Sequence, residues 1–264
     1  MDKIGLLGSI YHIAAAGGKL NDLPAKELTT ENLLKLDPYG NNVLHCAAKS
    51  GNLAQLPKKF MALEYLMLPS GGQDKDTTLH VAADKRILEQ VPAELLTWQA
   101  WSCKNAVGNT VLHCVAKYGF ELVPKDLITA GCFLDSNYKR ETVLHAAAAH
   151  GTLDKLPEDL LSVENLLERD LSDRTVYHIA ARDRNFNQIP KSSRLAGLEK
   201  MDVNGRTTIY WLLNRNHQDL LLGLEVPETV GRALGADWCA RNRAVLDSAK
   251  TLVIDDPTPD VDLF

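Results

Sequence analysis

The chain has few aromatic residues, little net charge and no long apolar segment. Aromatic residues make up 6% of its 264 residues, and 29 basic residues stand against 34 acidic ones, for a net charge of −5. No run of about 18 apolar residues is present, so the sequence predicts no transmembrane helix. The excess of basic residues that is typical of nucleic-acid-binding proteins is also missing. Neither a membrane nor nucleic acid is therefore expected as a partner.

Cysteine is scarce as well. The chain has five cysteines, and their spacing does not match that of a metal site. Two of them, Cys46 and Cys114, fall inside expected helices, which indicates reduced thiols. The first residues do not resemble a secretory signal. We therefore expect a cytoplasmic protein.

The short motifs of common enzymes are absent. There is no Gly-rich phosphate loop, no Gly-x-Ser-x-Gly and no His-Glu-x-x-His. Cys46 and Cys114 each follow a histidine directly, but adjacent side chains on a helix point about 100° apart and do not form a catalytic pair. We expect no enzymatic activity and no cofactor. An enzyme with an unrecognised site is the alternative.

What the sequence contains instead is a period of about 33 residues. Six of the eight histidines recur at intervals of 33, 35, 33, 32 and 33 residues: His12, His45, His80, His113, His145 and His178. Tyr210 follows His178 by 32 residues. Prolines follow the six histidines by 12 residues, except that the fourth spacing is 11: Pro24, Pro57, Pro92, Pro124, Pro157 and Pro190. Two residue types that share one period indicate internal repeats, which typically present an extended surface to a partner.

The segments around these histidines are similar to one another. Examples are Thr78-Leu79-His80-Val81-Ala82-Ala83 and Thr142-Val143-Leu144-His145-Ala146-Ala147-Ala148. A period near 33 with the pattern Thr-x-Leu-His-x-Ala-Ala resembles the ankyrin repeat, over about residues 9–215. The resemblance implies an all-α repeat solenoid of about six to seven repeats with a helical C-terminal cap, and a function in protein binding.

The residue types within a repeat have distinct local roles. Gly40, Gly108 and Gly205 are expected at positive φ in the turn before the first helix. The threonines before the histidines suit helix N-caps, and the Ala-Ala pairs allow neighbouring helices to approach closely. Proline fits the first turn of a helix, so we expect the second helix of each repeat to begin at its proline. A further helical turn is expected at residues 30–34 and 163–167.

The repeat pattern ends after Tyr210, where Trp211, Leu212 and Leu213 replace the small alanines. A solenoid needs an atypical terminal repeat that covers its core. We therefore predict an ankyrin-like repeat array at residues 1–215, a helical C-terminal cap at 216–254 and a flexible acidic tail at 255–264. A small accessory domain at residues 216–254 is the alternative to a cap.

The periodic histidines do not suit a metal site. Stacked helices lie roughly 8–10 Å apart, whereas zinc binds its nitrogen ligands at about 2 Å, so histidines one repeat apart cannot share an ion. We expect each imidazole to bond to backbone near the turns and to tie adjacent repeats together, as the ankyrin resemblance also implies. No metal is predicted.

The ankyrin resemblance places the partner-binding surface on the turns before the histidine segments and on the solvent side of the first helices. Tyrosines and arginines are weighted most, because they dominate binding hot spots. Acidic residues are concentrated in the early repeats and arginines in the late ones, which suggests a basic groove for an acidic protein patch. The candidate residues are Tyr39, Lys49, Asp74, Asp76, Lys85, Asn109, Lys117, Tyr118, Tyr138, Lys139, His150, Arg174, Arg182, Arg206 and Arg215.

Taken together, these features predict a monomeric, non-catalytic protein-protein interaction module that acts as an inhibitor, an immunity factor or an adaptor. The alternative is an accessory protein that docks on a replication or repair sliding clamp through its tail. The last five residues, Asp260-Val261-Asp262-Leu263-Phe264, resemble the short clamp-binding peptide of bacterial proteins, with Leu263 and Phe264 as its apolar anchors. The identity of the partner does not follow from the sequence, because repeat surfaces vary freely on a constant frame.

Overall fold

The computed structural model describes residues 9–215 and divides the chain into two compact units, residues 1–156 and 157–264. Within residues 9–215 the fold is all-α, built from short α-helices and 3-10 helices. This part of the chain contains isolated β-bridges but no β-strand, and no helix in it is long and apolar enough to span a membrane. The predicted cap (216–254) and tail (255–264) lie outside the described residues.

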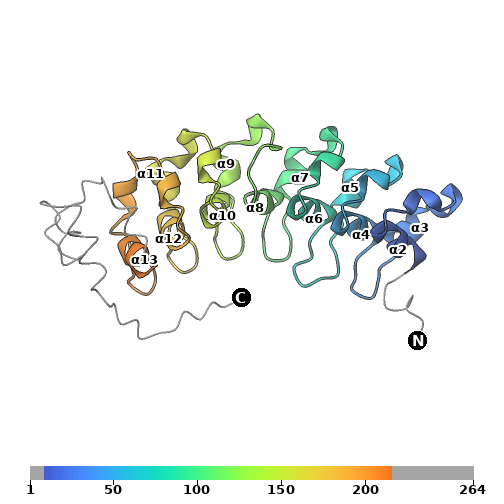
Figure 1. The fold of residues 1–264 in the computed structure, drawn as a ribbon, viewed down its shortest axis with the longest axis horizontal. Coiled ribbons are helices and arrows are strands. Elements are labelled where there is room, and N and C mark those ends of the chain that lie inside the picture. The colour runs from blue at the N-terminus through green and yellow to red at the C-terminus, as the bar shows by residue number, and fades with distance from the viewer. Residues whose placement is uncertain (1–8, 216–264) are drawn as a thin grey trace, which may run out of the picture. The chain divides into compact units, whose positions relative to one another are not determined.

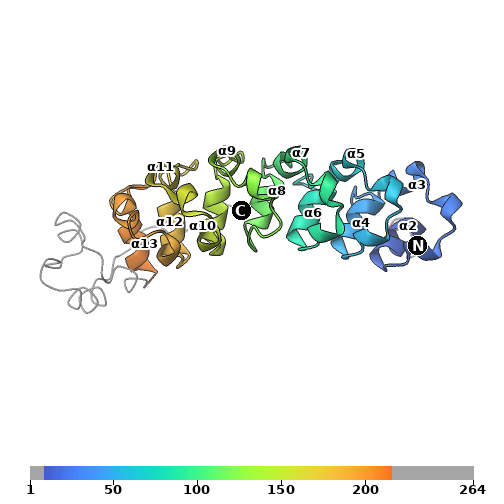
Figure 2. The same ribbon diagram turned by 90° about the horizontal axis from the view of Figure 1, so that it is seen from above.

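In the first unit, the helices that carry the periodic histidines lie side by side in one row (Figure 1). They are α2 (Ile10–Ala16), α4 (Val43–Lys49), α6 (Thr78–Asp84), α8 (Val111–Val115) and α10 (Val143–His150). A second row of shorter helices runs along this one, as the view from above also shows (Figure 2). It consists of α3 (Thr30–Leu34), α5 (Leu63–Leu66), α7 (Trp98–Ser102) and α9 (Ala130–Phe133).

The second unit contains α11 (Val163–Leu166), α12 (Val176–Arg182) and α13 (Thr208–Asn214), and α12 packs against α13. Tyr177 of α12 is fully buried, and its hydroxyl donates a hydrogen bond to the carbonyl of Ser193 at 2.8 Å. A Cβ at Gly197 would collide with the Tyr177 ring. A residue without a side chain is therefore required at this contact.

Each histidine helix begins with a cap to which the histidine itself contributes. In α6, the amide of His80 donates to the Thr77 hydroxyl, and His80 Nδ1 lies 2.8 Å from the same hydroxyl and accepts from the Thr77 amide. Thr110 and His113 repeat this arrangement in α8. The predicted threonine N-caps are confirmed, and histidine takes the place that Glu or Gln occupies in the usual capping box.

The expectation that a helix begins at each proline is wrong. Pro24 has ψ 129°, and its carbonyl accepts a hydrogen bond from Glu27, so it precedes a 3-10 helix, η2 (Ala25–Glu27). Equivalent 3-10 helices follow the other repeat prolines of the first unit: η4 (Lys58–Phe60), η6 (Ala93–Leu95) and η7 (Lys125–Leu127). In the second unit, Pro157 precedes η9 (Glu158–Leu161) in the same way. The proline thus occupies an N-cap position, where extended backbone is required, and not the first helical position. The later turn predicted at residues 30–34 and 163–167 is confirmed by α3 and α11.

A further 3-10 helix usually lies between the histidine helix and the proline. It is present as η1 (Leu20–Asp22), η3 (Leu53–Gln55), η5 (Leu88–Gln90) and η8 (Leu153–Lys155) in the first unit, and as η10 (Phe186–Gln188) in the second. Between α8 and Pro124 there is none. This is the segment in which the proline follows its histidine by 11 residues and not 12.

The alanines after the histidines are buried, as expected. Ala47 and Ala48 of α4 and Ala147 and Ala148 of α10 have no exposed surface. Small side chains at these positions let the helices of the first row pack closely.

Candidate functional site

The turns that precede the histidine helices form the candidate site; we call them the turn loops. In the first unit they comprise residues 37–42, 70–77, 105–110 and 137–142, and all project from the same side of the row of histidine helices (Figure 1). The second unit contains the loops 170–175 and 202–207.

An Asp or Asn side chain shapes most of these loops from inside. Asp37 Oδ1 accepts hydrogen bonds from the amides of Tyr39 and Asn41 at 2.9 and 2.8 Å. The same pair of bonds, to the second and fourth residues onward, is made by Asn105, Asn137, Asp170 and Asp202. An Asx side chain that replaces a backbone acceptor in this way stabilises a tight turn.

The periodic histidines form hydrogen bonds with backbone carbonyls of the turn loops. His12, His45 and His80 bond through Nε2 to the carbonyls of Asn41, Asp76 and Asn109 at 3.1, 3.1 and 2.9 Å, each about one repeat further along the chain. His113 and Glu141 make the same contact in the first unit, and His178 and Arg206 make it in the second. The prediction that these imidazoles tie adjacent repeats together through backbone is confirmed.

Burial favours the neutral form of four of these histidines. It lowers the pKa of His45 to about 4, and it also lowers the pKa of His80, His113 and His178. In His80, His113 and His178, Nδ1 accepts from the cap amide, so Nε2 carries the proton and donates to the loop carbonyl. In His45, Nδ1 lies 2.7 Å from Asn42 Oδ1. Both ring nitrogens are therefore used in the fold.

Neighbouring loops are also joined tip to tip. The amide of Gly71 donates to the carbonyl of Gly40, and the amide of Tyr138 donates to the carbonyl of Val107 at 3.1 Å. In the second unit the amide of Val203 donates to the carbonyl of Ser172 at 2.9 Å. A Cβ at Gly40, which has φ +75°, would collide with the backbone of Gly71. The loops of each unit are thus fixed relative to one another by backbone hydrogen bonds.

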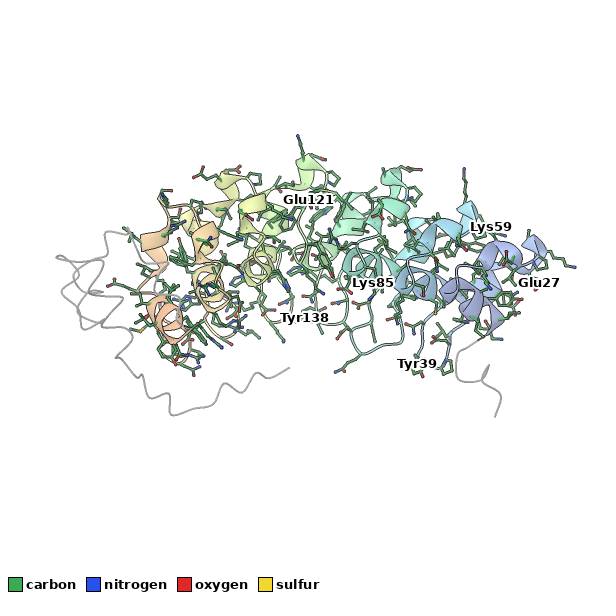
Figure 3. The ribbon with its side chains drawn as sticks, in the orientation of Figure 1. Glu27, Tyr39, Lys59, Lys85, Glu121 and Tyr138 are labelled. Atoms are coloured by element: carbon green, nitrogen blue, oxygen red, sulfur yellow. The ribbon has the colours of Figure 1, made fainter. Side chains whose placement is uncertain are left out.

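Large apolar side chains stand exposed at these fixed tips. Tyr39 is 65% exposed, Tyr138 67% and Val107 36%, and the two tyrosines extend from the turn loops of the first unit (Figure 3). In the second unit, Leu171 and Val203 are each 62% exposed. The sequence analysis identified the two tyrosines and missed the three aliphatic residues. Their position one or two residues after the Asx residue is the signal that could have identified them.

Other candidate residues lie around the loops and partly serve the scaffold. Lys49 Nζ donates to Asn41 Oδ1 at 2.8 Å, and Asp76 and Asn109 accept side-chain hydrogen bonds from the next loop. Lys85 and Lys117 both lie near the carboxylate of Asp84, at 3.9 and 3.2 Å. The remaining candidates, which are exposed, are Asp74, Lys139, His150 and Arg215.

The arginines of the predicted basic groove lie beside carboxylates. Arg174 pairs with Asp170 at 2.7 Å and Arg206 with Asp202 at 2.9 Å, and both aspartates are buried. Arg182 pairs with its neighbour Asp183 at 2.8 Å. These arginines compensate charges that the turns themselves require, so their contribution to a positive surface is smaller than the sequence suggests.

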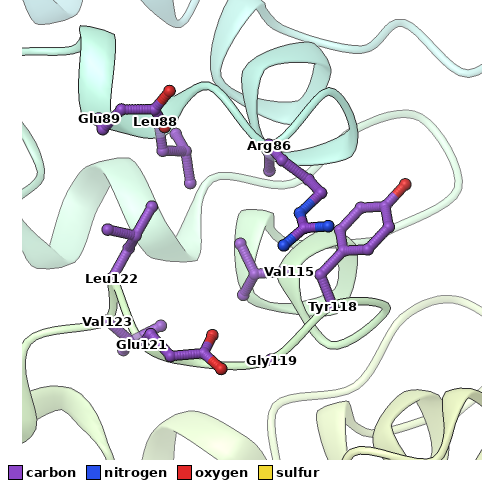
Figure 4. A pocket seen from close by; sticks show the side chains of 10 residues that line it. Arg86, Leu88, Glu89, Val115, Tyr118, Gly119, Glu121, Leu122 and Val123 are labelled. Atoms are coloured by element: carbon purple, nitrogen blue, oxygen red, sulfur yellow. The ribbon is translucent and has the colours of Figure 1, made fainter.

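Tyr118 does not lie with the other tyrosines. It is half-buried after the C-terminal end of α8, and the guanidinium of Arg86 lies 5.0 Å from its ring centroid. There it lines a pocket of about 320 Å³ (Figure 4). The candidates therefore lie in the turn loops, at or after the C-terminal ends of the first-row helices and of α12 and α13, and, for Tyr118, at this pocket.

Burial also affects the cysteines. It raises the pKa of Cys46 to about 11 and that of Cys114 to about 12, so both remain thiols at neutral pH. Among residues 9–215, no three His, Cys, Asp or Glu side chains are grouped to hold a metal ion. Leu263 and Phe264, the predicted clamp-binding anchors, lie outside the described residues.

Comparison with known proteins identifies similar structures but no family. No protein-family model matches the chain. No curated protein matches its sequence. A similar solved chain is part of the structure of the predatory endopeptidase Bd0816 from Bdellovibrio bacteriovorus in complex with the immunity protein Bd3460, with a TM-score of 0.52 and 21% identity. The match covers 67% of this chain and 93% of that chain. At this identity, the similarity concerns the fold.

Proposed function

We propose that this chain is a non-catalytic protein-binding module, built as an ankyrin-type repeat solenoid, whose turn loops form the binding surface. The observation that carries the proposal is the set of exposed apolar tips, Tyr39, Val107 and Tyr138, on loops held by Asx turns and tip-to-tip hydrogen bonds. The 33-residue period and the recurring histidine cap support the ankyrin-type assignment.

Rigid loops favour recognition because binding then requires little ordering of the surface. Association loses conformational entropy wherever mobile side chains or loops become fixed, and a preorganised surface reduces that loss. Tyrosine adds a large contact area with a polar end and is enriched at binding hot spots. Tyr39 and Tyr138 combine both properties.

A non-catalytic role is supported by how the reactive residue types are used. The periodic histidines bond through both ring nitrogens to caps and loop carbonyls, and Cys46 and Cys114 are buried thiols. These side chains stabilise the fold and are not directed at a substrate.

Among binding functions, an inhibitor or immunity role receives support from the structural comparison. The similar chain belongs to a complex of an endopeptidase with an immunity protein. We therefore propose that the partner is a protein, with an endopeptidase the first class to test, and that the chain binds it as a monomer.

Site-specific photo-crosslinking tests the proposed surface. A benzophenone amino acid replaces Tyr39 or Tyr138 in separate variants, and the exposed Lys59 of η4, away from the turn loops (Figure 3), is the matched control position. The same cellular protein should crosslink from positions 39 and 138 and not from 59. With that protein purified, Tyr39→Ala with Tyr138→Ala should weaken binding at least about tenfold, whereas Lys59→Ala should not. Crosslinking that is equal from all three positions, or absent at the loops, would overturn the proposal.

A further inference from the structure

The pocket beside Tyr118 coincides with the one irregular proline spacing. In each regular repeat of the first unit, one residue separates the sixth residue after the histidine from a buried leucine, as in Gly51-Asn52-Leu53, Arg86-Ile87-Leu88 and Gly151-Thr152-Leu153. In the fourth repeat Gly119 is followed directly by Phe120, so this residue is missing. Correspondingly, α8 has five residues, whereas α6 has seven and α10 has eight, and no 3-10 helix lies between α8 and Pro124.

The residue two positions before the proline shows how a side chain closes the junction between the second and third repeats. Gln90 Nε2 donates to the carbonyl of Gly51 at 3.1 Å, and Gln90 Oε1 accepts from the amide of Ala54 at 3.1 Å. One carboxamide thus binds both a backbone acceptor and a backbone donor of the preceding repeat. Lys155 makes a related contact, because its Nζ donates to the carbonyl of Tyr118 at 2.6 Å.

The corresponding residue of the fourth repeat is Leu122, which has no polar atom and is 49% exposed. The counterparts of Gly51 and Ala54 at this junction are Arg86 and Glu89, which follow His80 by six and nine residues and line the same pocket as Leu122. Among the hydrogen bonds of residues 9–215, none involves the Arg86 carbonyl or the Glu89 amide. The junction between the third and fourth repeats therefore keeps the backbone acceptor of Arg86 and the backbone donor of Glu89, but it lacks a carboxamide like that of Gln90.

The pocket has an apolar floor and a polar rim. Its floor includes Leu88, Val115 and Val123, all buried, and Leu122 forms one wall (Figure 4). Such a floor suits the methylene groups of a side chain and leaves the polar end at the backbone pair.

The rim selects against a charged head group. Glu121 is paired with Lys155 at 3.1 Å, and the nearby Arg86 and Glu89 carry opposite charges. In the part of the chain that the structure describes, neither Arg86 nor Glu89 forms an ion pair. A neutral group that both donates and accepts fits the backbone pair, whereas a carboxylate cannot donate to the Arg86 carbonyl and an ammonium cannot accept from the Glu89 amide.

We propose that this pocket binds a glutamine side chain presented by another polypeptide, in the way that Gln90 binds the preceding junction. The carboxamide nitrogen donates to the Arg86 carbonyl, and the carboxamide oxygen accepts from the Glu89 amide. The two methylene groups lie against Leu122 and Val115. The pocket is a second binding site, apart from the turn-loop surface.

Titration of the full-length, isotope-labelled protein with short blocked peptides tests this site by NMR. The probes are Ac-Gly-Gln-Gly-amide and matched peptides with glutamate or norleucine in the central position. The glutamine peptide should shift the Glu89 amide and the Leu122 and Val115 methyl signals. It should bind at least about fivefold more tightly than either control, the ratio that one net hydrogen bond confers.

The variant Leu122→Gln provides a second test, because it places a carboxamide of the chain itself beside the pocket. In the folded variant, the glutamine peptide should bind at least about fivefold more weakly than to the native chain. Tyr39→Ala should leave peptide binding unchanged, since that residue lies on a turn loop. No shift of the Glu89 amide, or equal binding of the norleucine peptide, would overturn the proposal. Either result would leave the turn-loop function untouched.

Discussion

At the scale of single residues, the periodic histidine contributes to the fold through both of its ring nitrogens. His80 closes a helix cap through Nδ1 and holds the next turn loop through Nε2. Both bonds need the neutral ring with its proton on Nε2, and burial favours that form because it penalises the charged imidazolium. The geometry of the turn loops therefore depends on the protonation state of these histidines.

We predict a loss of stability as the pH falls from 6.5 to 4. The unfolded chain binds protons on these histidines from about pH 6.5, whereas the pKa of His45 in the folded chain is about 4. Over this interval the unfolded state binds more protons, so the free energy of unfolding falls with pH, by about 3 kcal/mol for His45 alone. Urea unfolding at a series of pH values measures the slope. His45→Gln, which does not titrate, should reduce it, and an unchanged slope would contradict the prediction.

We predict that Arg206 stabilises the fold. Its guanidinium pairs with the buried Asp202 at 2.9 Å and lies 4.4 Å from the Trp211 ring centroid. Arg206→Glu would place two carboxylates together and leave a buried charge uncompensated, at a cost of about 3–5 kcal/mol. Arg215→Glu, at an exposed position, is the control. Thermal unfolding should show a large loss for the first variant and little change for the second; equal effects would argue against this role.

At the scale of elements, the repeats differ chiefly in how the histidine helix passes to the proline. A short 3-10 helix makes this connection elsewhere in the first unit, and its loss after α8 accompanies the pocket. The missing residue is the counterpart of Asn52, whose carbonyl accepts from the Gln55 amide at 3.1 Å, so after α8 only the next bond of this kind remains, from the Val123 amide to the Phe120 carbonyl at 3.0 Å. A single such turn is too short to count as a 3-10 helix.

Restoring the missing residue should close the pocket. An asparagine inserted between Gly119 and Phe120 recreates the order of Gly51-Asn52-Leu53, in which Asn52 Nδ2 donates to the carbonyl of Ala15 in the preceding repeat. We expect the midpoint of urea unfolding to rise and binding of the glutamine peptide to disappear. A matched insertion between Gly71 and Gly72, in an exposed loop, should leave peptide binding unchanged. Persistent peptide binding in the first variant would count against the link between spacing and pocket.

Helix packing gives a separate prediction. Ala147 is fully buried in α10, so Ala147→Leu should overpack the contact between neighbouring helices and cost about 1–3 kcal/mol. Ala146→Leu adds the same volume on the same helix at a partly exposed position and should cost less. Thermal unfolding of both variants measures the difference. If Ala147→Leu unfolds like the native chain, close packing at the alanines does not explain the fold.

At the scale of the whole molecule, each compact unit repeats one surface design. Asx residues shape the turns, histidines hold them, and exposed apolar side chains stand at their tips: Tyr39, Val107 and Tyr138 in the first unit, Leu171 and Val203 in the second. A surface built from such equivalent parts can change its tip residues without changing its frame, which suits partner recognition.

The histidines give a prediction for the whole protein about metal. Because their ring nitrogens are occupied by caps and loop carbonyls, the purified protein should contain no stoichiometric zinc. Elemental analysis measures the content, and circular dichroism before and after chelation should show the same helicity. One tightly bound zinc per chain would require a different interpretation of the periodic histidines.

The sequence alone determined the features that depend on nearby residues. Caps and positive-φ glycines follow from contacts within three or four positions, and the period of the sequence predicted the helical repeats, the close-packed alanines and the histidine ties. Only the tertiary structure decided the contacts in which one repeat differs from the others. These include the separation of Tyr118 from Tyr39 and Tyr138 and the closure of a junction by Gln90 where Leu122 leaves one open. Arg206 and its partner Asp202 are only four residues apart in the chain. The burial of Asp202, which makes the loss of this ion pair costly, comes from packing. The physical reason is that spacing along the chain predicts local hydrogen bonds. The burial of a side chain and its partners across a junction depend on which residues of the next repeat pack against it.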